Sequence, residues 1–230
     1  QLATTGNFLG TEALNQPIAL PGADASGVAT VMGNWTGNQF RAGNVTKLVL
    51  EAGTHRLTAG VWIDYGNDRV TQSYTSLGQD GLPLDEWGYQ ARAIKTADGR
   101  LLAYENTRTL TVAKAFFVAD SMTVTPRLTL DVGFKGVDML RHGRNFLPGP
   151  QSGVHYDSFA ALPRAAVHYR IDERQQLFAN ISTNFSAPIE FALYNSYDGG
   201  AISAQGTSAL RNEYSVSQEI GYRYIGPNLS

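Results

Sequence analysis

Residues 162–188 carry a hydrophobic pattern that predicts a complete β-hairpin. Over residues 165–171 apolar side chains alternate with small or polar ones, and this period of two is the signature of a strand. The polar run 172–175 interrupts the pattern, and a second alternation follows over residues 177–185. The stretch therefore predicts two strands joined by a tight polar turn, each with one apolar and one polar face.

The same alternation recurs along the chain and is cleanest in residues 127–137. The first 38 residues lack a sustained period, so they predict a long loop with a short strand near 28–32. The complete set of about seven predicted strands lies near residues 40–51, 57–75, 101–120, 127–137, 165–171, 177–185 and 213–224.

The predicted connections alternate between short and long. Short ones fall near residues 52–56, 121–125 and 172–175, and long ones near residues 78–99, 140–161 and 187–210. Alternating faces fit either a soluble sheet with a buried apolar face or an outer-membrane barrel whose apolar face meets lipid. Tight turns at one end and long loops at the other are typical of the barrel. The fold prediction is therefore all-β, an antiparallel up-and-down meander that forms a partial wall of a large transmembrane β-barrel.

The composition and the motifs exclude several kinds of partner and site. The formal net charge is −2 and no basic stripe occurs, which argues against nucleic acid as a partner. The absence of cysteine excludes disulfides and thiolate metal sites. No apolar run approaches the roughly 18 residues of a transmembrane helix. No nucleophile elbow or phosphate-binding glycine loop occurs, and the four histidines lack zinc-ligand spacing. We therefore expect no catalytic residue, no metal site and no cofactor.

Several ordered stretches resemble the barrel of a TonB-dependent outer-membrane receptor. The most telling are QLFANISTNFSAP at residues 176–188 and NEYSVSQEIGYR at residues 212–223. Residues 53–60, 117–120 and 127–135 are weaker matches that occur in the expected order. The resemblance implies a closed 22-strand barrel filled by an N-terminal plug.

With about seven strands and no plug-like region, residues 1–230 are expected to be one partial barrel domain that lacks the plug and the other strands. Such a sheet would have two open edges, near residues 40–51 and 213–224.

The resemblance also implies a function for a longer parent protein. That protein would lie in the bacterial outer membrane, in contact with lipid, and would take up a scarce, bulky nutrient such as a ferric siderophore. Its partners would be its own plug domain and an inner-membrane energy-transducing complex. Two alternatives stay open: another outer-membrane barrel, such as a porin or an adhesin, and a soluble carbohydrate-binding β-sandwich.

Two groups of residues are candidate site residues. Aromatic and cationic side chains in the predicted outer loops could contact a ligand, or could pack loop on loop. These are Trp87, Tyr89, His142, Arg144, His155 and Tyr156. Four charged residues are predicted to face the barrel lumen, where they could form networks along the wall, contact the plug or bind substrate. These are Asp131, Lys135, Glu219 and Arg223.

Overall fold

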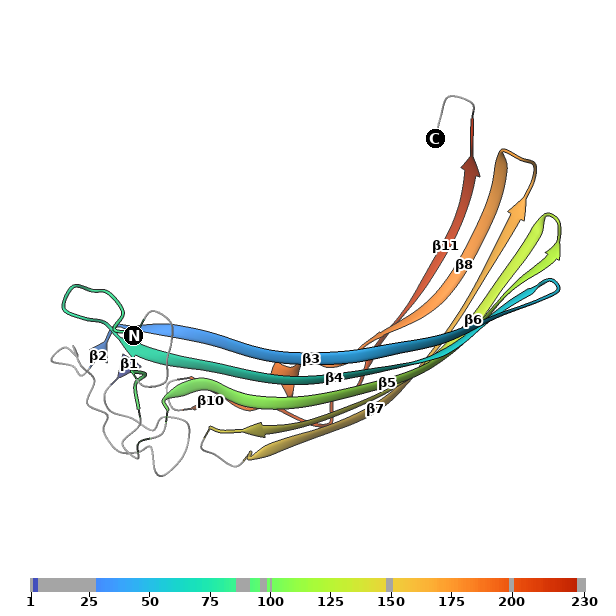
Figure 1. Ribbon diagram of the computed structural model, residues 1–230. Helices are drawn as coiled ribbons and strands as arrows, with labels where there is room; N and C mark the ends of the chain where they lie inside the picture. The colour runs from blue at the N-terminus through green and yellow to red at the C-terminus, as the bar shows by residue number, and fades with distance from the viewer. Residues whose placement is uncertain are drawn as a thin grey trace.

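Seven long strands form a single antiparallel sheet in the computed structural model (Figure 1). The structure describes residues 2–3, 28–85, 92–95, 99, 101–147, 151–198 and 201–226. The strands of the sheet are β3 (Val31–Ala52), β4 (His55–Ser76), β5 (Ala103–Thr125), β6 (Leu128–Asn145), β7 (Gly153–Arg170), β8 (Gln175–Ser186) and β11 (Glu213–Tyr224). Their order in the sheet is their order in the chain, so the predicted meander is confirmed.

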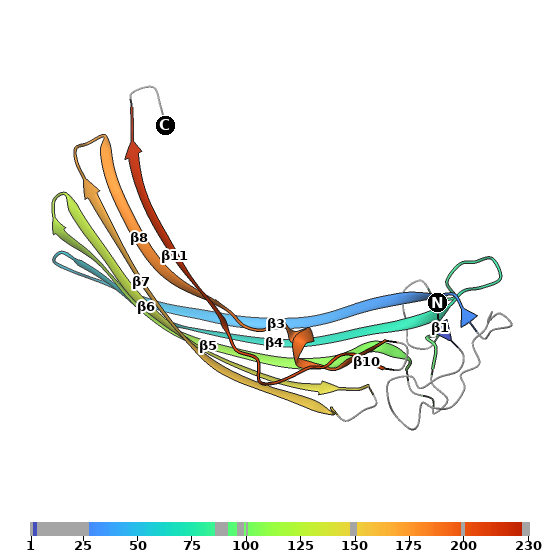
Figure 2. The same cartoon turned by 180° about the vertical axis from the view of Figure 1, so that it is seen from behind.

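The sheet is strongly curved and stays open (Figures 1 and 2). The strand order begins with β3 and ends with β11, which are the two edges predicted from the sequence. Four short elements accompany the sheet: β1 (Leu2–Ala3) pairs with β2 (Val28–Ala29), and β9 (Ser196–Asp198) pairs with β10 (Ala201–Ala204). One 3-10 turn, η3 (Glu190–Leu193), precedes β9. Among the described residues no helix is long and apolar enough to cross a membrane.

The register separates the side chains into two faces. Val132 lies opposite Ala165, which lies opposite Ile181, so one apolar row crosses β6, β7 and β8. The adjacent row, through Asp131 and Asn180, lies on the other face. We call the face of Val132 the outer face and the face of Asp131 the inner face.

Large apolar side chains of the outer face are exposed in this sheet. The exposed fraction is 43% for Val132, 45% for Ile181 and 87% for Ile220. Soluble monomers rarely expose a contiguous apolar surface of this extent, whereas a lipid-facing barrel wall requires one.

Two predicted connections are wrong in position. β6 continues to Asn145 and β7 begins at Gly153, so strand occupies most of the loop predicted at 140–161. The turn predicted near 121–125 lies instead at Pro126 and Arg127. β3 likewise begins at Val31, well before residue 40. In these parts of β3, β6 and β7 apolar and polar residues do not alternate regularly, so the pattern that identifies strands is lost.

The short turn between β3 and β4 is confirmed. Ala52 pairs with His55, so only Gly53 and Thr54 connect the two strands. Gly53 has a φ of 62°, a left-handed conformation that glycine adopts without a steric penalty. The long connections predicted at 78–99 and 187–210 also separate strands in the structure, between β4 and β5 and between β8 and β11.

Candidate ligand-contacting site on the inner face

The connection between β8 and β11 folds back onto the inner face of the sheet. Tyr194, just after η3, is its main anchor, with only 2% of its surface exposed. The Thr109 hydroxyl lies 2.8 Å from the Tyr194 hydroxyl, which donates to the carbonyl oxygen of Arg108 at 3.2 Å. A Cβ added at Gly143 would overlap this hydroxyl, so glycine there leaves the space that the tyrosine fills.

Burial raises the pKa of Tyr194 to about 12, and its phenol therefore stays protonated at neutral pH.

Two side-chain amides, those of Asn145 and Gln151, fix the connection near the ends of β6 and β7 through three hydrogen bonds. Asn145 Nδ2 donates to the carbonyl oxygen of Asn195 at 3.1 Å. Gln151 Nε2 donates to the carbonyl oxygen of Leu193 at 2.9 Å, and Gln151 Oε1 accepts from the Asn195 backbone at 2.7 Å. Because backbone groups outside regular structure need other partners, these side chains stabilise the folded-back path.

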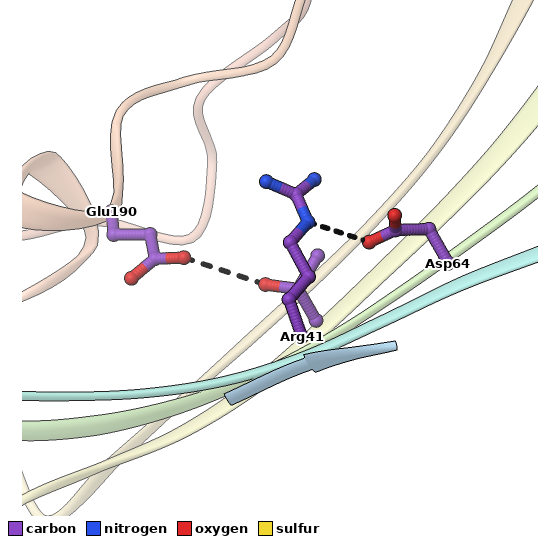
Figure 3. Close-up of polar contacts among 4 residues, drawn as sticks. Arg41, Asp64 and Glu190 are labelled. Atoms are coloured by element: carbon purple, nitrogen blue, oxygen red, sulfur yellow. Dashed lines mark hydrogen bonds and ion pairs between the residues drawn. The ribbon is translucent and has the colours of Figure 1, made fainter. Parts of the chain in front are cut away.

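Glu190 brings a carboxylate from this connection towards the polar side chains of the sheet (Figure 3). It accepts a hydrogen bond from Thr111 Oγ1 at 3.4 Å. Burial raises the pKa of Glu190, and the negative charge of Asp68 raises it further. Nearby, Arg41 Nε lies 2.9 Å from Asp64 Oδ1, and the Arg41 side chain is 60% exposed. The guanidinium is thus held from one side and open to solvent on the other.

A groove of about 480 Å³ lies on the inner face between the strands and η3. Trp35 and Tyr104 contribute aromatic rings from β3 and β5, and the Phe191 ring stacks against Tyr104 with 6.4 Å between ring centroids. Trp35 is 73% exposed. Glu105 also lines the groove, and burial raises the pKa of its carboxyl. Exposed aromatic rings beside a few polar groups are the usual composition of a small-molecule site.

The six residues predicted to contact ligand do not form one group. Trp87 and Tyr89 lie outside the described residues. His142, Arg144, His155 and Tyr156 lie within β6 and β7 rather than in a loop. Tyr156 is buried on the inner face and donates to Asn212 Oδ1 at 2.6 Å. The other three lie on the outer face, and a role of all six in ligand binding stays a prediction.

The register places the four predicted lumen charges on the inner face. His168 Nε2 lies 3.5 Å from Asp131 Oδ2. Lys135 lies over the Trp62 ring at 5.1 Å. Glu219 accepts from Asn180 Nδ2 at 2.9 Å, and Arg223 lies opposite Gln176. These contacts fit a wall network, and contact with a plug or a substrate stays a prediction.

Sequence reasoning missed the residues that build the groove and the fold-back. Trp35 lies in the stretch interpreted as an N-terminal loop, and Glu190, Phe191 and Tyr194 lie in one interpreted only as a long connection. The run EFALY at residues 190–194 carried a usable signal, because aromatic and aliphatic residues clustered inside a polar loop predict docking on a surface. Within the described ranges, no three His, Cys, Asp or Glu side chains lie close enough to hold a metal ion.

Comparison with known families agrees with the fold. Residues 4–230 match the family model described as TonB dependent receptor-like, beta-barrel. The chain belongs to the TonB-dependent receptor family. This family comprises receptors and transporters rather than enzymes. No curated protein sequence matches the chain.

Solved structures of the TonB-dependent receptor family share the fold of this chain. The unliganded ferric citrate transporter FecA superposes with a TM-score of 0.58 at 17% identity, over 84% of this chain and 26% of FecA. The siderophore receptor PiuA from Acinetobacter baumannii gives 0.55 at 12% identity, over 86% of this chain and 30% of PiuA.

The ferric yersiniabactin uptake receptor FyuA from Yersinia pestis gives 0.53 at 12% identity, over 88% of this chain and 28% of FyuA. The chain thus spans less than a third of the length of these three receptors.

Proposed function

We propose that the chain is a wall segment of an outer-membrane receptor that takes up a scarce, bulky nutrient, such as a ferric siderophore, by energy-coupled transport. Residues 1–230 would form part of its barrel domain. A plug domain and an inner-membrane energy-transducing complex would complete the transport machinery. The membership of the TonB-dependent receptor family supports this function, and the names of FecA, PiuA and FyuA all refer to iron chelates or siderophores.

The groove beside the folded-back connection is the observation that carries the proposal. Trp35 and Phe191 line the groove with aromatic rings, and the solvent-exposed Arg41 guanidinium lies outside the groove, further along the inner face of β3. Ferric chelates are bulky, and aromatic side chains beside a few polar groups are the usual lining of a site for a ligand of that kind. Because the connection forms one wall of the groove, a shift of η3 would change the shape offered to the ligand.

The rival functions make different demands on the structure. A carbohydrate-binding β-sandwich needs a second sheet packed at about 10 Å over the apolar face. Among the described residues the seven long strands form one sheet, and the large side chains of its outer face remain exposed. A passive porin or an adhesin would share this wall, so uptake that depends on an energy source is the property that separates the proposal from those two.

Uptake by the parent receptor tests the proposal. The receptor would be expressed in a bacterial strain that lacks its own iron-chelate receptors, and binding and uptake of a panel of radiolabelled ferric chelates would be measured. Uptake of at least one chelate should cease when the proton gradient is collapsed, while binding persists. Uptake that survives this treatment would support a porin, and a lack of binding across the panel would contradict the proposal.

Variants of the groove residues make the test specific. Trp35→Ala and Phe191→Ala should each weaken binding of the recognised chelate about tenfold, because each removes an aromatic surface from the groove. The matched control is Phe159→Ala, which removes an aromatic ring that is 55% exposed on the outer face. The control should leave the affinity unchanged. Equal effects of all three variants would mean that the groove does not bind the chelate.

A further inference from the structure

Three arginines form a row across the outer face. Arg69 of β4 lies directly opposite Arg108 of β5, which lies directly opposite Arg144 of β6. All three side chains are exposed. Like charges opposite each other on neighbouring strands repel, so a row of three destabilises the bare sheet unless an anion lies between them. The row therefore indicates that these arginines bind an anion that is not part of the sheet.

The three guanidinium groups are held in position before any ligand binds. The Phe146 ring lies under two of them, with the Arg69 guanidinium carbon 5.3 Å and the Arg144 guanidinium carbon 5.1 Å from its centroid. Arg108 Nε donates to Asn67 Oδ1 at 3.0 Å. Fixed guanidinium groups lose less entropy when they bind an anion, and their planar donors match phosphate oxygens in pairs.

Acidic side chains that lie at the same level along the strands as the three arginines are on the inner face of the sheet. Asp68, the residue before Arg69, lies opposite Thr109 on the inner face, and Glu105 lines the inner groove. Among the described residues none of the three arginines forms an ion pair with a carboxylate. The closest carboxylate along the outer face of β6 and β7 is that of Asp157, opposite Leu140. The row is therefore a net cationic patch.

On β5 the row lies just beyond Leu110 and Val112 of the outer face, and on β6 His142 lies between Arg144 and Leu140. Below the row on β3 and β4 lie Phe40 and Tyr65, whose rings meet edge to face at 6.4 Å, as in the aromatic girdle at a membrane interface. Arg69 lies about 14 residues after the first residue of β4. At ~3.3 Å per residue and a strand tilt of ~40°, this places Arg69 roughly 35 Å above the turn between β3 and β4. The hydrocarbon layer is about 30 Å thick. The arginines thus reach the level of lipid head groups.

We propose that Arg69, Arg108 and Arg144 bind the phosphate groups of the anionic glycolipid that fills the outer leaflet of the outer membrane. The inference rests on the proposed location of the barrel in that membrane. Basic side chains at an interface bind anionic head groups, and the aromatic and apolar rows below would contact the acyl chains of the same lipid. The imidazoles of His142 and His155, with 3.2 Å between their Nδ1 atoms, lie in the next row towards the membrane and border the patch.

Lipid retention by the purified parent receptor tests this site. The full receptor, solubilised in a neutral detergent, would be titrated with bisphosphorylated lipid A, with its fully dephosphorylated form and with inorganic phosphate. The variant Arg69→Ala/Arg108→Ala/Arg144→Ala should bind bisphosphorylated lipid A about 100-fold more weakly, because each basic residue adds to the attraction of an anionic head group. The dephosphorylated lipid should bind the wild type and the variant equally weakly.

A control variant removes three arginines from the other end of the strands. Arg127→Ala/Arg170→Ala/Arg174→Ala changes the net charge by the same amount and should bind lipid A as the wild type does. The triple lysine variant at 69, 108 and 144 should keep part of the affinity, and heat-modifiable migration in electrophoresis would verify that every variant is folded.

Two results would overturn the proposal. One is equal loss in the control and the alanine variant. The other is wild-type binding of inorganic phosphate as tight as that of bisphosphorylated lipid A, which would mark a general anion site. Because lipid retention is measured without any ferric chelate, its outcome is independent of whether the receptor transports one.

Discussion

Replacing Ile181 by arginine would place a charge on the outer face of β8. Ile181 is 45% exposed and lies opposite Ala165 on β7, and Leu177 and Ala179 precede it on the same face. Thr183 and Phe185 follow, so the position is central among the outer residues of its strand. If lipid covers this face, the new guanidinium would enter the hydrocarbon layer.

The expected penalty differs sharply between lipid and water. An arginine on the lipid face near the midplane destabilises a transmembrane barrel by about 2–4 kcal/mol. At ~1.4 kcal/mol per factor of ten, this lowers the folding equilibrium constant by a factor of about 30 to 700. A substitution at an exposed site in water usually changes the stability by no more than about 0.5 kcal/mol. The two environments therefore predict separable outcomes.

The next residue supplies a matched control. Asn180 lies on the inner face, where its Nδ2 donates to Glu219 Oε2 at 2.9 Å. Asn180→Arg introduces the same side chain in the same strand and can pair with Glu219, so it should change the stability little. Denaturant titration of the parent receptor in lipid vesicles gives both free energies of unfolding. Equal values for Ile181→Arg and Asn180→Arg would refute the assignment of the outer face to lipid.

Three further predictions concern the folded-back connection. Tyr194→Phe removes the hydrogen bond with Thr109 and should weaken docking by about 1 kcal/mol, seen as faster hydrogen exchange in residues 192–196. Gly143→Ala should release the segment further, because its Cβ would displace the Tyr194 hydroxyl. Since the folded-state pKa of Glu190 is raised, docking should be strongest below the ordinary glutamate pKa and weaken as the pH rises through the raised value. A spin label at Gln205 should report this loss of order, and Glu190→Gln should abolish it.

The sequence predicted the strands well where the side chains of the two faces differ most. Leu128, Leu130, Val132 and Phe134 alternate with polar or small residues, as expected of a strand with one face towards hydrocarbon and the other towards a barrel lumen. That contrast ends near the end of β6, where His142 and Arg144 lie on one face and Gly143 and Asn145 on the other. No local signal marks a strand there, so the sequence predicts loops over the parts of β3, β6 and β7 that lie nearest the long connections.

The candidate site depends on contacts between residues that lie far apart in the sequence. Tyr194 docks on Thr109 and Glu190 on Thr111, across some 80 residues of chain. Nothing near Thr109 indicates that a loop from a distant hairpin will cover it. The row of arginines was hidden for the same reason, because only the register brings Arg69, Arg108 and Arg144 together.

The assignment of the two faces of β6 is tested most directly by solvent accessibility along the strand. The chain contains no cysteine, so it contributes no background to single-cysteine labelling. Spin labels would be placed one at a time from residue 128 to residue 135 of the parent receptor in lipid vesicles, and collision rates with oxygen and with a water-soluble nickel complex would be compared. Labels at Leu128, Leu130, Val132 and Phe134 should favour oxygen, and those at the four intervening residues should favour nickel. A uniform profile, or nickel preference at the apolar positions, would contradict a lipid-facing barrel wall.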